Sequence, residues 1–566
     1  MSFGMESARS LLRYRAVGGS VCQAKDTAGW GGRIRTCAWR IQSPLPYRLA
    51  TPQGRWRIDP MIRVSPLIIH AAMLALASSG VGNFVYSHHM ALSSLRTVIL
   101  AAGQGTRLRS STPKVLHALA GRPVLSYVLD AAHGVSADPP LVVVHPSHQE
   151  VQAFVEASGG IPVPQRESRG TGDAVRSIPE EFRHADTFVV LSGDTPLVTG
   201  DTVRNIIDRH AATGNAATVA TFRLRGMNSY GRIERDPQNG TVCGIREARD
   251  RGEESGNEEH EYNAGLYCFA SDHLFAALEK LTPDNAQGEY YLSDVIGLLV
   301  PHGVGTFVLD DAEELAGIND QRDFAKVEQV MRSKIADRLM DGGVHLVDPA
   351  TTYCDWDVHV DAGTTIQPGC VIQGKTTIGA GCRIGPYAQL RDMLVGSGCS
   401  IGSSTLEESK LGAGVTVGQY CRVRTGCTID DSVYLGTAAE VKNAHIGARS
   451  FISHFSCVLD AEVGTDVNVG AGTVTCNFDG TSKHRTIMGD GAFIGSDSIL
   501  VAPCVIGKHA YVGAGSVITH DVPDDALAVE RNQQRNVDGW ALRRRAHMSI
   551  QDQGTIPSPT PLEPSS

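Results

Sequence analysis

The stretch LAAGQGTRLRSSTPKVLHALAG, residues 100–121, decides the fold of the first half of the chain. It continues the apolar run VILA at 98–101, which predicts a buried strand, and Gly103 and Gly105 follow directly. A strand, a glycine turn and a helix-like stretch are the arrangement with which α/β proteins bind phosphate. A dinucleotide fingerprint would need glycine where Leu108 stands, and a P-loop would need its lysine directly after glycine. We therefore predict a phosphate-binding loop of another kind.

The composition is that of a large globular protein with several domains. Its 566 residues are 42% apolar and include 61 glycines, which predicts many tight turns. The 13 cysteines form neither a CxxC pair nor a cluster with histidine, which favours a reducing, cytoplasmic location and argues against zinc. The net charge of −10 argues against a nucleic-acid groove, because such grooves are basic. We expect small-molecule substrates.

Residues 1–95 differ from the rest of the chain, because they are rich in arginine, poor in acidic residues and irregular. They contain the apolar run PLIIHAAMLALASSGVGNFVY at 66–86, which has the length of a membrane span or signal segment. His70, the polar residues in this run and its distance from Met1 oppose both interpretations. We predict an extension that is disordered or precedes the true start, without membrane contact; a targeting or anchoring segment is the alternative.

Residues 96–318 alternate between short apolar runs and helix-like stretches, as in LVVVH at 141–145 and TFVVLSGD at 187–194. This alternation predicts a Rossmann-like, mostly parallel sheet covered by helices on both faces. Ligands of such sheets bind at the carboxyl ends of the strands, where the glycine loop and Asp194 both lie. A carboxylate beside a phosphate-binding loop favours a magnesium site over a simple turn residue.

Eight motifs in this domain carry a resemblance to sugar-nucleotide pyrophosphorylases, and among them to the bacterial bifunctional enzymes that make UDP-N-acetylglucosamine. The likeness covers nearly all of residues 97–531. The motifs are LAAGQGTRLRSSTPKVLH (100–117), QRESRGTGDA (165–174), LSGDTPL (191–197), YGRI (230–233), IREARD (245–250), YNAGLY (262–267), NAQGEYYLSD (285–294) and GIND (317–320). A single motif would be weak evidence, whereas eight in the family's order are specific.

The resemblance implies that this domain transfers UMP from UTP to N-acetylglucosamine-1-phosphate. The glycine loop and the basic residues would bind the triphosphate, Gln165 and the Gly170-Thr171 turn would bind uracil, and Asp194 with Asn319 would hold Mg²⁺. Gly231, Glu247 and Asn263 would bind the sugar phosphate. The complete set implied for UTP and UDP-N-acetylglucosamine is Leu100, Ala101, Gly103, Gly105, Arg107, Lys114, Gln165, Gly170, Thr171, Asp194, Gly231, Glu247, Asn263 and Asn319. Without the motif order, we would interpret Glu247 as part of a solvated ion pair with Arg246, and Asn263 as a turn residue.

Residues 319–343 predict one long amphipathic helix that links two domains. Phe324, Val327, Met331 and Ile335 are spaced as on one face of a helix, and Gly342-Gly343 is a stop signal. We interpret this apolar stripe as packing and not as a partner-binding face.

Residues 344–530 repeat with a period of six. The aliphatic residues of the repeat recur at 366, 372, 378, 384 and 390, again at 411–441, and again at 494–518. Such a repeat predicts short strands joined by tight turns, three to a coil, with the aliphatic side chains stacked inside a parallel β-helix. The resemblance to hexapeptide-repeat proteins implies that the helix is left-handed. By the same logic Cys421 and Cys427, six apart, are predicted to be stacked neighbours.

The resemblance assigns acetyl transfer to this domain. His454, which interrupts an aliphatic register, matches the general base that deprotonates the amine of glucosamine-1-phosphate, although a lone histidine is more often structural. Residues that match sugar-phosphate positions are Arg424, Lys442, Cys457 and Asn468, with Glu440 near them. Residues that match the acetyl-CoA side are Asn477, Phe478, Lys483, Ser496, Ala514 and Arg531. The family's sites lie between chains, which implies a homotrimer.

Three departures from the family pattern lie near this site. Cys457 and Phe478 stand where tyrosine is usual, and Val458-Leu459 replaces Leu-Gly. Loss of a hydrogen bond to a charged phosphate costs about 1.5–3 kcal/mol, so we expect weakened acetylation and not its loss.

The C-terminal tail comprises residues 531–566, and its residues 540–566 are predicted to be disordered. The whole sequence predicts a bifunctional enzyme that acetylates glucosamine-1-phosphate and then uridylates the product, with acetyl-CoA and UTP as co-substrates. The alternatives are a sugar-1-phosphate nucleotidyltransferase whose β-helix only trimerises it, and a non-enzymatic trimer with an inactive nucleotide-binding domain.

Overall fold

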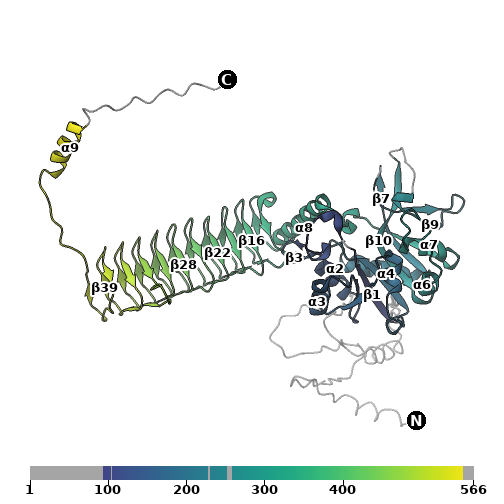
Figure 1. Ribbon diagram of the computed structural model, residues 1–566, viewed down its shortest axis with the longest axis horizontal. Coiled ribbons are helices and arrows are strands. Elements are labelled where there is room, and N and C mark those ends of the chain that lie inside the picture. Colours follow the sequence, from purple (N-terminus) through teal and green to yellow (C-terminus); the bar gives the residue numbers. More distant parts are fainter. Residues whose placement is uncertain (1–93, 104, 227, 229, 251–257, 552–566) are drawn as a thin grey trace, which may run out of the picture. The chain divides into compact units, whose positions relative to one another are not determined.

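The computed structural model describes residues 94–103, 105–226, 228, 230–250 and 258–551 (Figure 1). The predicted extension therefore lies outside the described residues except for its last two positions, as does the segment at 66–86. Strand β1 (Leu95–Ala101) begins one residue before the predicted domain boundary. In the part of the chain that is described, no helix has the length and apolar character needed to cross a membrane.

The nucleotidyltransferase-like domain is built on a mixed sheet with the order β11-β7-β10-β6-β1-β4-β5. Strands β5, β4, β1 and β6 are parallel and follow the order of a doubly wound half. Strand β10 is antiparallel to both of its neighbours, β6 and β7. The bounds are β4 (Leu141–Val144), β5 (Ile161–Pro164), β6 (Thr187–Ser192), β7 (Ala217–Arg225), β8 (Arg232–Arg235), β9 (Val242–Arg246), β10 (Glu259–Ala270) and β11 (Val304–Val308), with a separate hairpin of β2 (Ala118–Leu119) and β3 (Arg122–Pro123).

Helices cover both faces of this sheet, as the alternation predicted. Alternate residues of β1 show the division: Val98 packs in one core and Ile99 in the other. The first core is closed by α4 (Thr171–Arg176), α6 (Ser271–Leu278) and α7 (Leu292–Leu299). The second is closed by α2 (Val124–His133), α3 (Gln149–Ala157) and α5 (Gly200–Thr213).

The ends of β1 and β6 are aligned, which places two predicted site segments together. Leu100 is in register with Ser192, and the Gly193 N–H donates to the Leu100 carbonyl at 2.9 Å. A methyl group on Gly193 would lie 2.9 Å from that carbonyl oxygen, so this position requires glycine. The glycine loop after β1 therefore lies directly beside Asp194.

Helix α8 (Gln321–Asp341) is the predicted linker helix. The Asp320 side chain caps its start by accepting from the N–H groups of Arg322 and Asp323. The side chains of Val327, Met331, Ile335 and Leu339 are buried, whereas Phe324 is only half-buried. These residues belong to the core that continues into the β-helix, so the stripe is packing, as predicted.

The second domain is a parallel β-helix with three sheets, one on each face (Figure 1). The first face runs from β12 (His345–Leu346) to β41 (Leu527–Ala528), the second from β13 (Tyr353–Cys354) to β40 (Val517–Ile518), and the third from β14 (His359–Val360) to β38 (Cys504–Ile506). The predicted aliphatic positions point inward and are buried, among them Ile366, Ile372 and Ile378 on the three successive faces. The hexapeptide prediction is confirmed.

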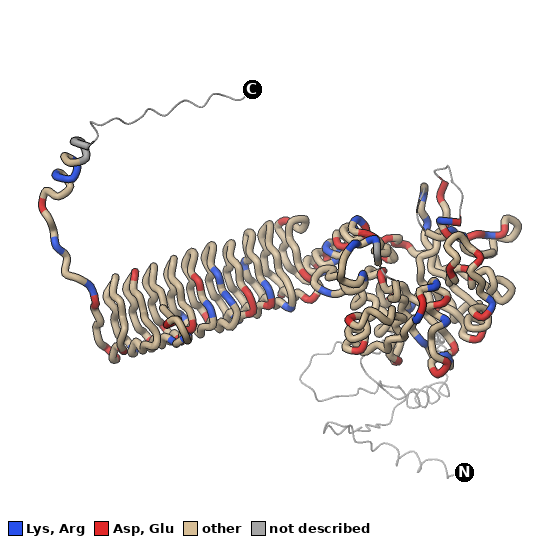
Figure 2. Tube along the Cα trace, in the orientation of Figure 1, with Lys and Arg blue, Asp and Glu red and all other residues tan. Residues whose placement is uncertain are grey.

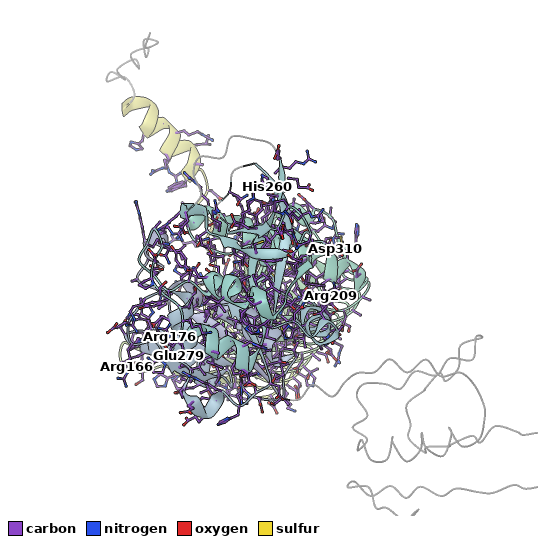
Figure 3. The ribbon with its side chains drawn as sticks, turned by 90° about the vertical axis from the view of Figure 1, so that its right-hand side faces the viewer. Arg166, Arg176, Arg209, His260, Glu279 and Asp310 are labelled. Carbon is purple, nitrogen blue, oxygen red and sulfur yellow. The ribbon has the colours of Figure 1, made fainter. Side chains whose placement is uncertain are left out.

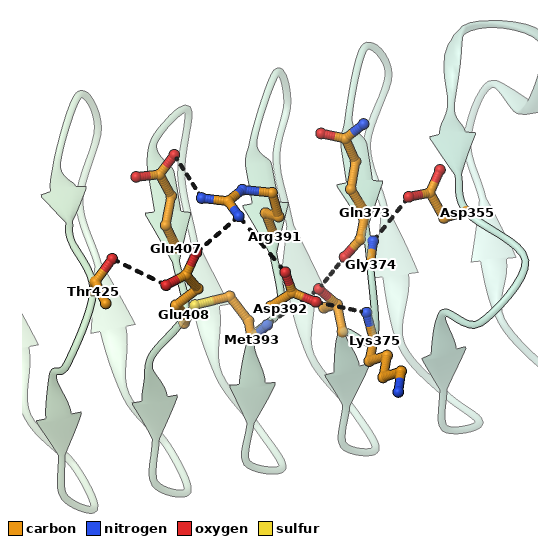
Figure 4. A network of polar contacts seen from close by, with 11 residues as sticks. Asp355, Gln373, Gly374, Lys375, Arg391, Asp392, Met393, Glu407, Glu408 and Thr425 are labelled. Carbon is orange, nitrogen blue, oxygen red and sulfur yellow. Dashed lines mark hydrogen bonds and ion pairs between the residues drawn. The ribbon is translucent and has the colours of Figure 1, made fainter. Parts of the chain in front are cut away.

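Turns between the second and third faces are stabilised by side chains that bond to the next coil (Figure 4). The Asp355 carboxylate accepts from the Gly374 N–H at 2.8 Å, and Asp392 accepts from the Lys375 N–H at 2.9 Å. Arg391 lies 2.8 Å from Glu408 across adjacent coils. Figure 2 shows that charged residues of the β-helix gather along one edge.

Three predictions about particular segments are wrong. Cys421 and Cys427 are both buried but not stacked, because stacked residues are one coil of three hexapeptides apart, as Cys382 is from Cys399. His454 lies in an exposed turn, and the inward register is kept by Ile452 and Val458. The tail is not uniformly irregular, because α9 (Trp540–Gln551) is helical; residues 552–566 lie outside the described part.

Candidate functional site

A cleft of about 350 Å³ opens at the carboxyl edge of the sheet, between the glycine loop and α4. Its lining includes eight of the residues predicted to bind the nucleotide: Leu100, Ala101, Gly103, Lys114, Gln165, Gly170, Thr171 and Asp194. Ser168, Ser192 and Glu289 also line it and were not singled out from the sequence. The structure thus brings together residues as far apart in the chain as Leu100 and Glu289.

Glycine serves a different purpose at each of the two loop positions, 103 and 105. Gly105 has a φ of +61°, and a methyl group there would lie 2.7 Å from Cβ of Lys114. Gly105 is therefore needed for the tight turn and for close packing of Lys114. A methyl group on Gly103 would meet no atom within 4 Å. This open space beside the backbone is where a ligand can approach the loop.

The turn at Gly170 forms the other wall of the cleft. Gly170 has a φ of +114°, and a methyl group there would lie 2.5 Å from the carbonyl oxygen of Tyr290. The Gly172 N–H donates to the same carbonyl at 2.7 Å, and the Thr171 hydroxyl accepts from the Leu292 N–H at 2.9 Å. Two distant motifs, GTGDA and GEYYLSD, therefore hold each other in place.

Gln165 is fixed in this wall with its side chain 3% exposed. Its amide nitrogen donates to the Gly170 carbonyl and to Asp173, both at 3.1 Å. Asp173 also accepts from Arg169 at 2.9 Å, so it positions the amide that was predicted to read uracil. Farther along α4, Arg176 donates to the Leu278 carbonyl, next to Glu279 (Figure 3). The sequence analysis missed Asp173 and Tyr290, although both lie within the quoted motifs.

Asp194 and Asn319, the predicted metal ligands, lie close together. A methyl group on Gly317 would be 3.8 Å from Oδ1 of Asp194 and 3.9 Å from Nδ2 of Asn319. Asp194 accepts from the Ser192 hydroxyl at 2.8 Å and forms an ion pair with Lys114, while Asn319 accepts from Arg107 at 2.9 Å.

This donor set fits Mg²⁺. One carboxylate and one amide oxygen beside a phosphate-binding loop are what Mg²⁺ uses when substrate phosphates and water complete its coordination. Among the described residues there is no cluster of three or more His, Cys, Asp or Glu side chains suited to a metal ion.

The residues predicted to bind the sugar phosphate converge at one place. The Asn263 N–H donates to the Gly231 carbonyl at 2.7 Å, and a methyl group on Gly231 would lie 3.1 Å from Glu247 Oε1. Glu247 accepts from the Ser293 hydroxyl at 2.7 Å and is not paired with Arg246.

Asn263 lies at a bulge of β10, where its amide nitrogen donates to the Tyr267 hydroxyl at 2.6 Å. Burial, with a contribution from the Glu247 carboxylate, raises the pKa of Tyr267, so that its hydroxyl stays protonated.

On the β-helix, Arg424, Glu440 and Cys457 are neighbours on the second face. Arg424 donates to Glu440 at 3.0 Å, and Glu440 in β28 (Glu440–Lys442) is in register with Cys457 in β31 (Cys457–Leu459). Burial raises the pKa of the Cys457 thiol, and Glu440 adds to the rise, whereas Arg424 opposes it. Cys457 is therefore a neutral thiol and a weak substitute for a phenol.

Asp460 connects three further predicted residues. Its carboxylate accepts from the side-chain amides of Asn443 and Asn477. Burial raises the pKa of Asp460, but these two amides, together with Lys483 and Lys442, outweigh burial and hold the pKa below its ordinary value. The inserted loop that bears Asn477 and Lys483 is thus attached beside Lys442. Asp460 directly follows Val458-Leu459 in the chain but was not among the predicted site residues.

His454, Ser496 and Ala514 occupy one corner column of the β-helix. The Gly472 N–H donates to the His454 carbonyl at 3.2 Å, and the Gly515 N–H donates to the Ser496 carbonyl at 2.8 Å in later coils. Arg531 donates to the Ala514 carbonyl at 2.9 Å. The His454 side chain is exposed and its ring lies 5.4 Å from that of Phe455.

Asn468 is separate from the other predicted sugar-phosphate residues, and Phe478 lies on the inserted loop with Asn477 and Lys483. Asn468 in β33 (Asn468–Val469) lies on the first face, whereas Arg424, Lys442 and Cys457 lie on the second. Phe478 is 59% exposed on the inserted loop, which an antiparallel bridge to Lys483 closes. One chain does not bring Asn468 onto the face of the other sugar-phosphate residues.

Comparisons with known proteins agree with this architecture. Residues 97–296 match the MobA-like NTP transferase domain, residues 355–446 the GMPPB C-terminal domain, and residues 485–520 the bacterial transferase hexapeptide with six repeats. The Bifunctional protein GlmU of Streptomyces avermitilis is 41% identical over 461 residues, 80% of this chain and 95% of that protein. That of Heliobacterium modesticaldum is 43% identical over 450 residues, 79% of this chain and 98% of that protein.

This chain belongs to the GlmU family. The resemblance stated from the motifs is confirmed, and so is the fold class: an α/β nucleotidyltransferase domain, a linker helix and a left-handed β-helix of hexapeptide repeats. The protein is an enzyme with a nucleotidyltransferase domain and an acetyltransferase domain. This favours the bifunctional prediction over the single-activity and non-enzymatic alternatives. The domain boundaries and the roles of individual residues stay predictions.

Proposed function

We propose that this protein acetylates glucosamine-1-phosphate with acetyl-CoA and then transfers UMP from UTP to the resulting N-acetylglucosamine-1-phosphate. The products are UDP-N-acetylglucosamine and pyrophosphate, and the pathway served is the supply of cell-wall and lipopolysaccharide precursors in the cytoplasm. The observation that carries the proposal is the cleft lined by Gly103, Lys114 and Asp194, together with the nearby Asn319, which accepts from Arg107.

Uridylyl transfer needs positioning more than covalent chemistry. The Gly103–Gly105 loop and the two cations bind the triphosphate, and Gln165 with the Gly170 turn holds uracil. The sugar side, at Gly231, Glu247 and Asn263, directs a phosphate oxygen at the α-phosphorus. That bond forms as the bond to the β-phosphate oxygen breaks and pyrophosphate leaves. Mg²⁺ held by Asp194 and Asn319 supplies positive charge to the triphosphate.

Acetyl transfer needs a base, because the ammonium form of the sugar amine is not a nucleophile. His454 takes a proton from the amine as the nitrogen attacks the thioester carbonyl, after which the C–S bond breaks and CoA leaves with a proton. Arg424 and Lys442 hold the sugar phosphate. Ser496 and Ala514 of the corner column, with Arg531 beside them, bind acetyl-CoA. The exposed position of His454 supports this role, since a structural histidine would be buried and bonded.

A homotrimer would complete this second site. Asn468 and the cluster at Arg424 are on different faces of one β-helix, so we propose that adjacent chains contribute them to a shared site. The first face also carries stacked aromatic side chains, Tyr434 on Phe451 at 4.3 Å and Phe493 on Tyr511 at 5.2 Å. All four are at least 36% exposed, which is unusual for large apolar groups unless another surface covers them.

The test is a coupled assay with glucosamine-1-phosphate, acetyl-CoA, UTP and Mg²⁺, in which CoA thiol and pyrophosphate are both measured. Wild-type protein should release both. Asp194→Ala should stop pyrophosphate release and spare CoA release, and His454→Ala should do the reverse when N-acetylglucosamine-1-phosphate is supplied. Pyrophosphate without CoA from wild-type protein would favour the alternative, a single-activity nucleotidyltransferase.

A further inference from the structure

Two basic side chains are bonded to the two proposed metal ligands. The Lys114 ammonium pairs with Oδ2 of Asp194, and Arg107 Nη2 donates to Oδ1 of Asn319 at 2.9 Å. The other carboxylate oxygen of Asp194 accepts from the Ser192 hydroxyl at 2.8 Å. A cation that binds Oδ2 of Asp194 or Oδ1 of Asn319 therefore competes with a positive charge that belongs to the protein, whereas Oδ1 of Asp194 is engaged by a neutral hydroxyl.

The pair of Lys114 and Asp194 is shielded from water. Their side chains are 14% and 18% exposed, so solvent screens the attraction less than it screens a surface pair. A bound cation and the Lys114 ammonium cannot occupy the same carboxylate oxygen. A cation that binds Oδ2 of Asp194 therefore displaces the ammonium, and an ammonium released inside a shielded cleft needs another negative partner.

The cleft offers a place for that partner. Lys114 lines the same cleft as Gly103, where no atom lies within 4 Å of an added methyl group. Close packing of Gly105 against Cβ of Lys114 fixes the base of the lysine side chain. Rotation about the outer bonds of the side chain is therefore sufficient to carry the ammonium from Asp194 to a phosphate in the cleft.

We propose that Lys114 and Arg107 act as exchangeable counter-ions of the metal site. In the ligand-free protein they neutralise Asp194 and occupy the Asn319 oxygen; with a triphosphate bound, they release both side chains and pair with phosphate oxygens. This inference rests on the proposed uridylyl-transfer function. It implies that a divalent cation alone and UTP alone each bind weakly, because each must compete with the internal pair, and that together they bind with positive coupling.

The first test measures Mn²⁺ binding to the full-length protein without nucleotide, by the electron paramagnetic resonance signal of free Mn²⁺. Lys114→Gln should bind Mn²⁺ at least tenfold more tightly than wild type, and Lys280→Gln, which removes an exposed lysine elsewhere, should bind as wild type does. This increase in Mn²⁺ affinity should be lost when Asp194→Asn is added to Lys114→Gln. Equal affinities of Lys114→Gln and wild type would overturn the proposal.

The second test is the reciprocal one, with UTP titrated calorimetrically in EDTA. Asp194→Asn should bind UTP at least fivefold more tightly than wild type, because Lys114 is free to meet the phosphates. In the Lys114→Gln background the same substitution should change UTP affinity less than twofold. An undiminished gain in that background would show that Asp194 acts only by repulsion and would overturn the exchange. Lys114→Met repeats both titrations, so that a folding defect of one variant does not decide the result.

Pyrophosphate release by wild-type protein separates this proposal from the proposed function. Release of pyrophosphate together with unchanged Mn²⁺ affinity in Lys114→Gln would overturn the counter-ion role alone. If the Mn²⁺ and UTP affinities of the variants change as predicted but wild-type protein releases no pyrophosphate, the counter-ion role is supported and the assigned reaction is overturned.

Discussion

At the scale of single residues, the surroundings of a side chain determine whether it can contact substrate or only stabilise the fold. Cys457 and His210 show two opposite cases. Cys457 is half-buried beside Arg424 and Glu440, where we propose that the sugar phosphate binds within reach of a longer hydroxylated side chain. His210 is 5% exposed and bonds only within the domain core, through Thr218 at 3.0 Å. We therefore expect Cys457 to affect substrate binding and His210 to affect stability.

We expect Cys457→Tyr to strengthen binding of glucosamine-1-phosphate. A phenol can donate a hydrogen bond to the sugar phosphate, worth about 1.5–3 kcal/mol, so the KM for this substrate should fall roughly tenfold or more. Steady-state kinetics of CoA release measure it. Cys476→Tyr, on the neighbouring strand, is the matched control and should leave KM unchanged. A KM for Cys457→Tyr equal to that of wild type would place the sugar phosphate elsewhere.

The stability of the first domain should depend on pH through His210. Burial lowers the pKa of His210 to about 4, whereas the unfolded chain has the ordinary value of 6.5. As the pH falls, the unfolded state therefore binds a proton before the folded state does. The contribution of His210 to the free energy of unfolding is complete above pH 6.5 and decreases between pH 6.5 and 4, by up to about 3 kcal/mol.

Thermal unfolding at pH 7.5 and pH 5 checks this. His210→Phe should reduce the acid-induced drop in melting temperature, while His184→Gln, at an exposed position, should not. An identical drop in His210→Phe and wild type would mean that other groups cause the acid sensitivity.

At the scale of elements, the site depends on turns that two distant segments hold together. The Gly170 turn, which begins α4, is fixed by the backbone of Tyr290 ahead of α7. The inserted loop of the β-helix is fixed in the same way through Asp460. These contacts join segments whose order in the sequence says nothing of their proximity.

Gly170→Ala should loosen the nucleotide cleft. The new methyl group would lie 2.5 Å from the Tyr290 carbonyl at a φ of +114°, where strain alone costs about 1–3 kcal/mol. The KM for UTP should rise at least tenfold with acetylation unchanged. Gly240→Ala is the control, because Gly240 has a φ of +72° but no atom within 4 Å. Unchanged UTP kinetics in Gly170→Ala would show that this turn does not form part of the binding site.

Sequence periodicity predicted the elements well where one repeat dominates. The six-residue period gave the inward ladder at Ile366, Ile372 and Ile378, and the helical spacing gave α8. It failed for Cys421 and Cys427, because the period along the chain is one hexapeptide whereas the period of stacking is a whole coil. It also failed for His454, since a turn residue and a ladder residue are only two positions apart.

The nucleotide site was predictable as a set of residues but not as a set of contacts. Motif order gave Asp194, Asn319, Lys114 and Arg107, and adjacent strand ends explain why they meet. The ion pair of Lys114 with Asp194 and the support of Gln165 by Asp173 required coordinates, because each depends on side-chain direction in three dimensions.

At the scale of the whole molecule, two domains carry separate reactions, and we propose that the acetyl transfer requires other chains. The nucleotide cleft is formed within one chain, whereas the acetyltransferase residues are divided between two faces of the β-helix. The exposed aromatic stack on the first face is the surface on which we expect the copies to associate. The two activities should therefore respond differently to dissociation.

Phe451→Glu should break the trimer, since it places a charge in the stack with Tyr434. Light scattering should give the mass of a monomer, CoA release should fall by at least tenfold, and pyrophosphate release should persist. Leu394→Glu alters an exposed apolar residue on the third face and should remain trimeric. A monomeric wild-type protein with full acetyltransferase activity would refute the shared site.

The central claim is that Asp194 and Asn319 present a divalent cation to a triphosphate bound by the glycine loop. Crystals grown with UTP and Mn²⁺ test it most directly through the anomalous signal of manganese. The account predicts a peak at about 2.1 Å from an oxygen of Asp194 and from the Asn319 amide oxygen, with Lys114 turned to the phosphates. A peak elsewhere, or a triphosphate outside the cleft beside Gly103, would contradict it.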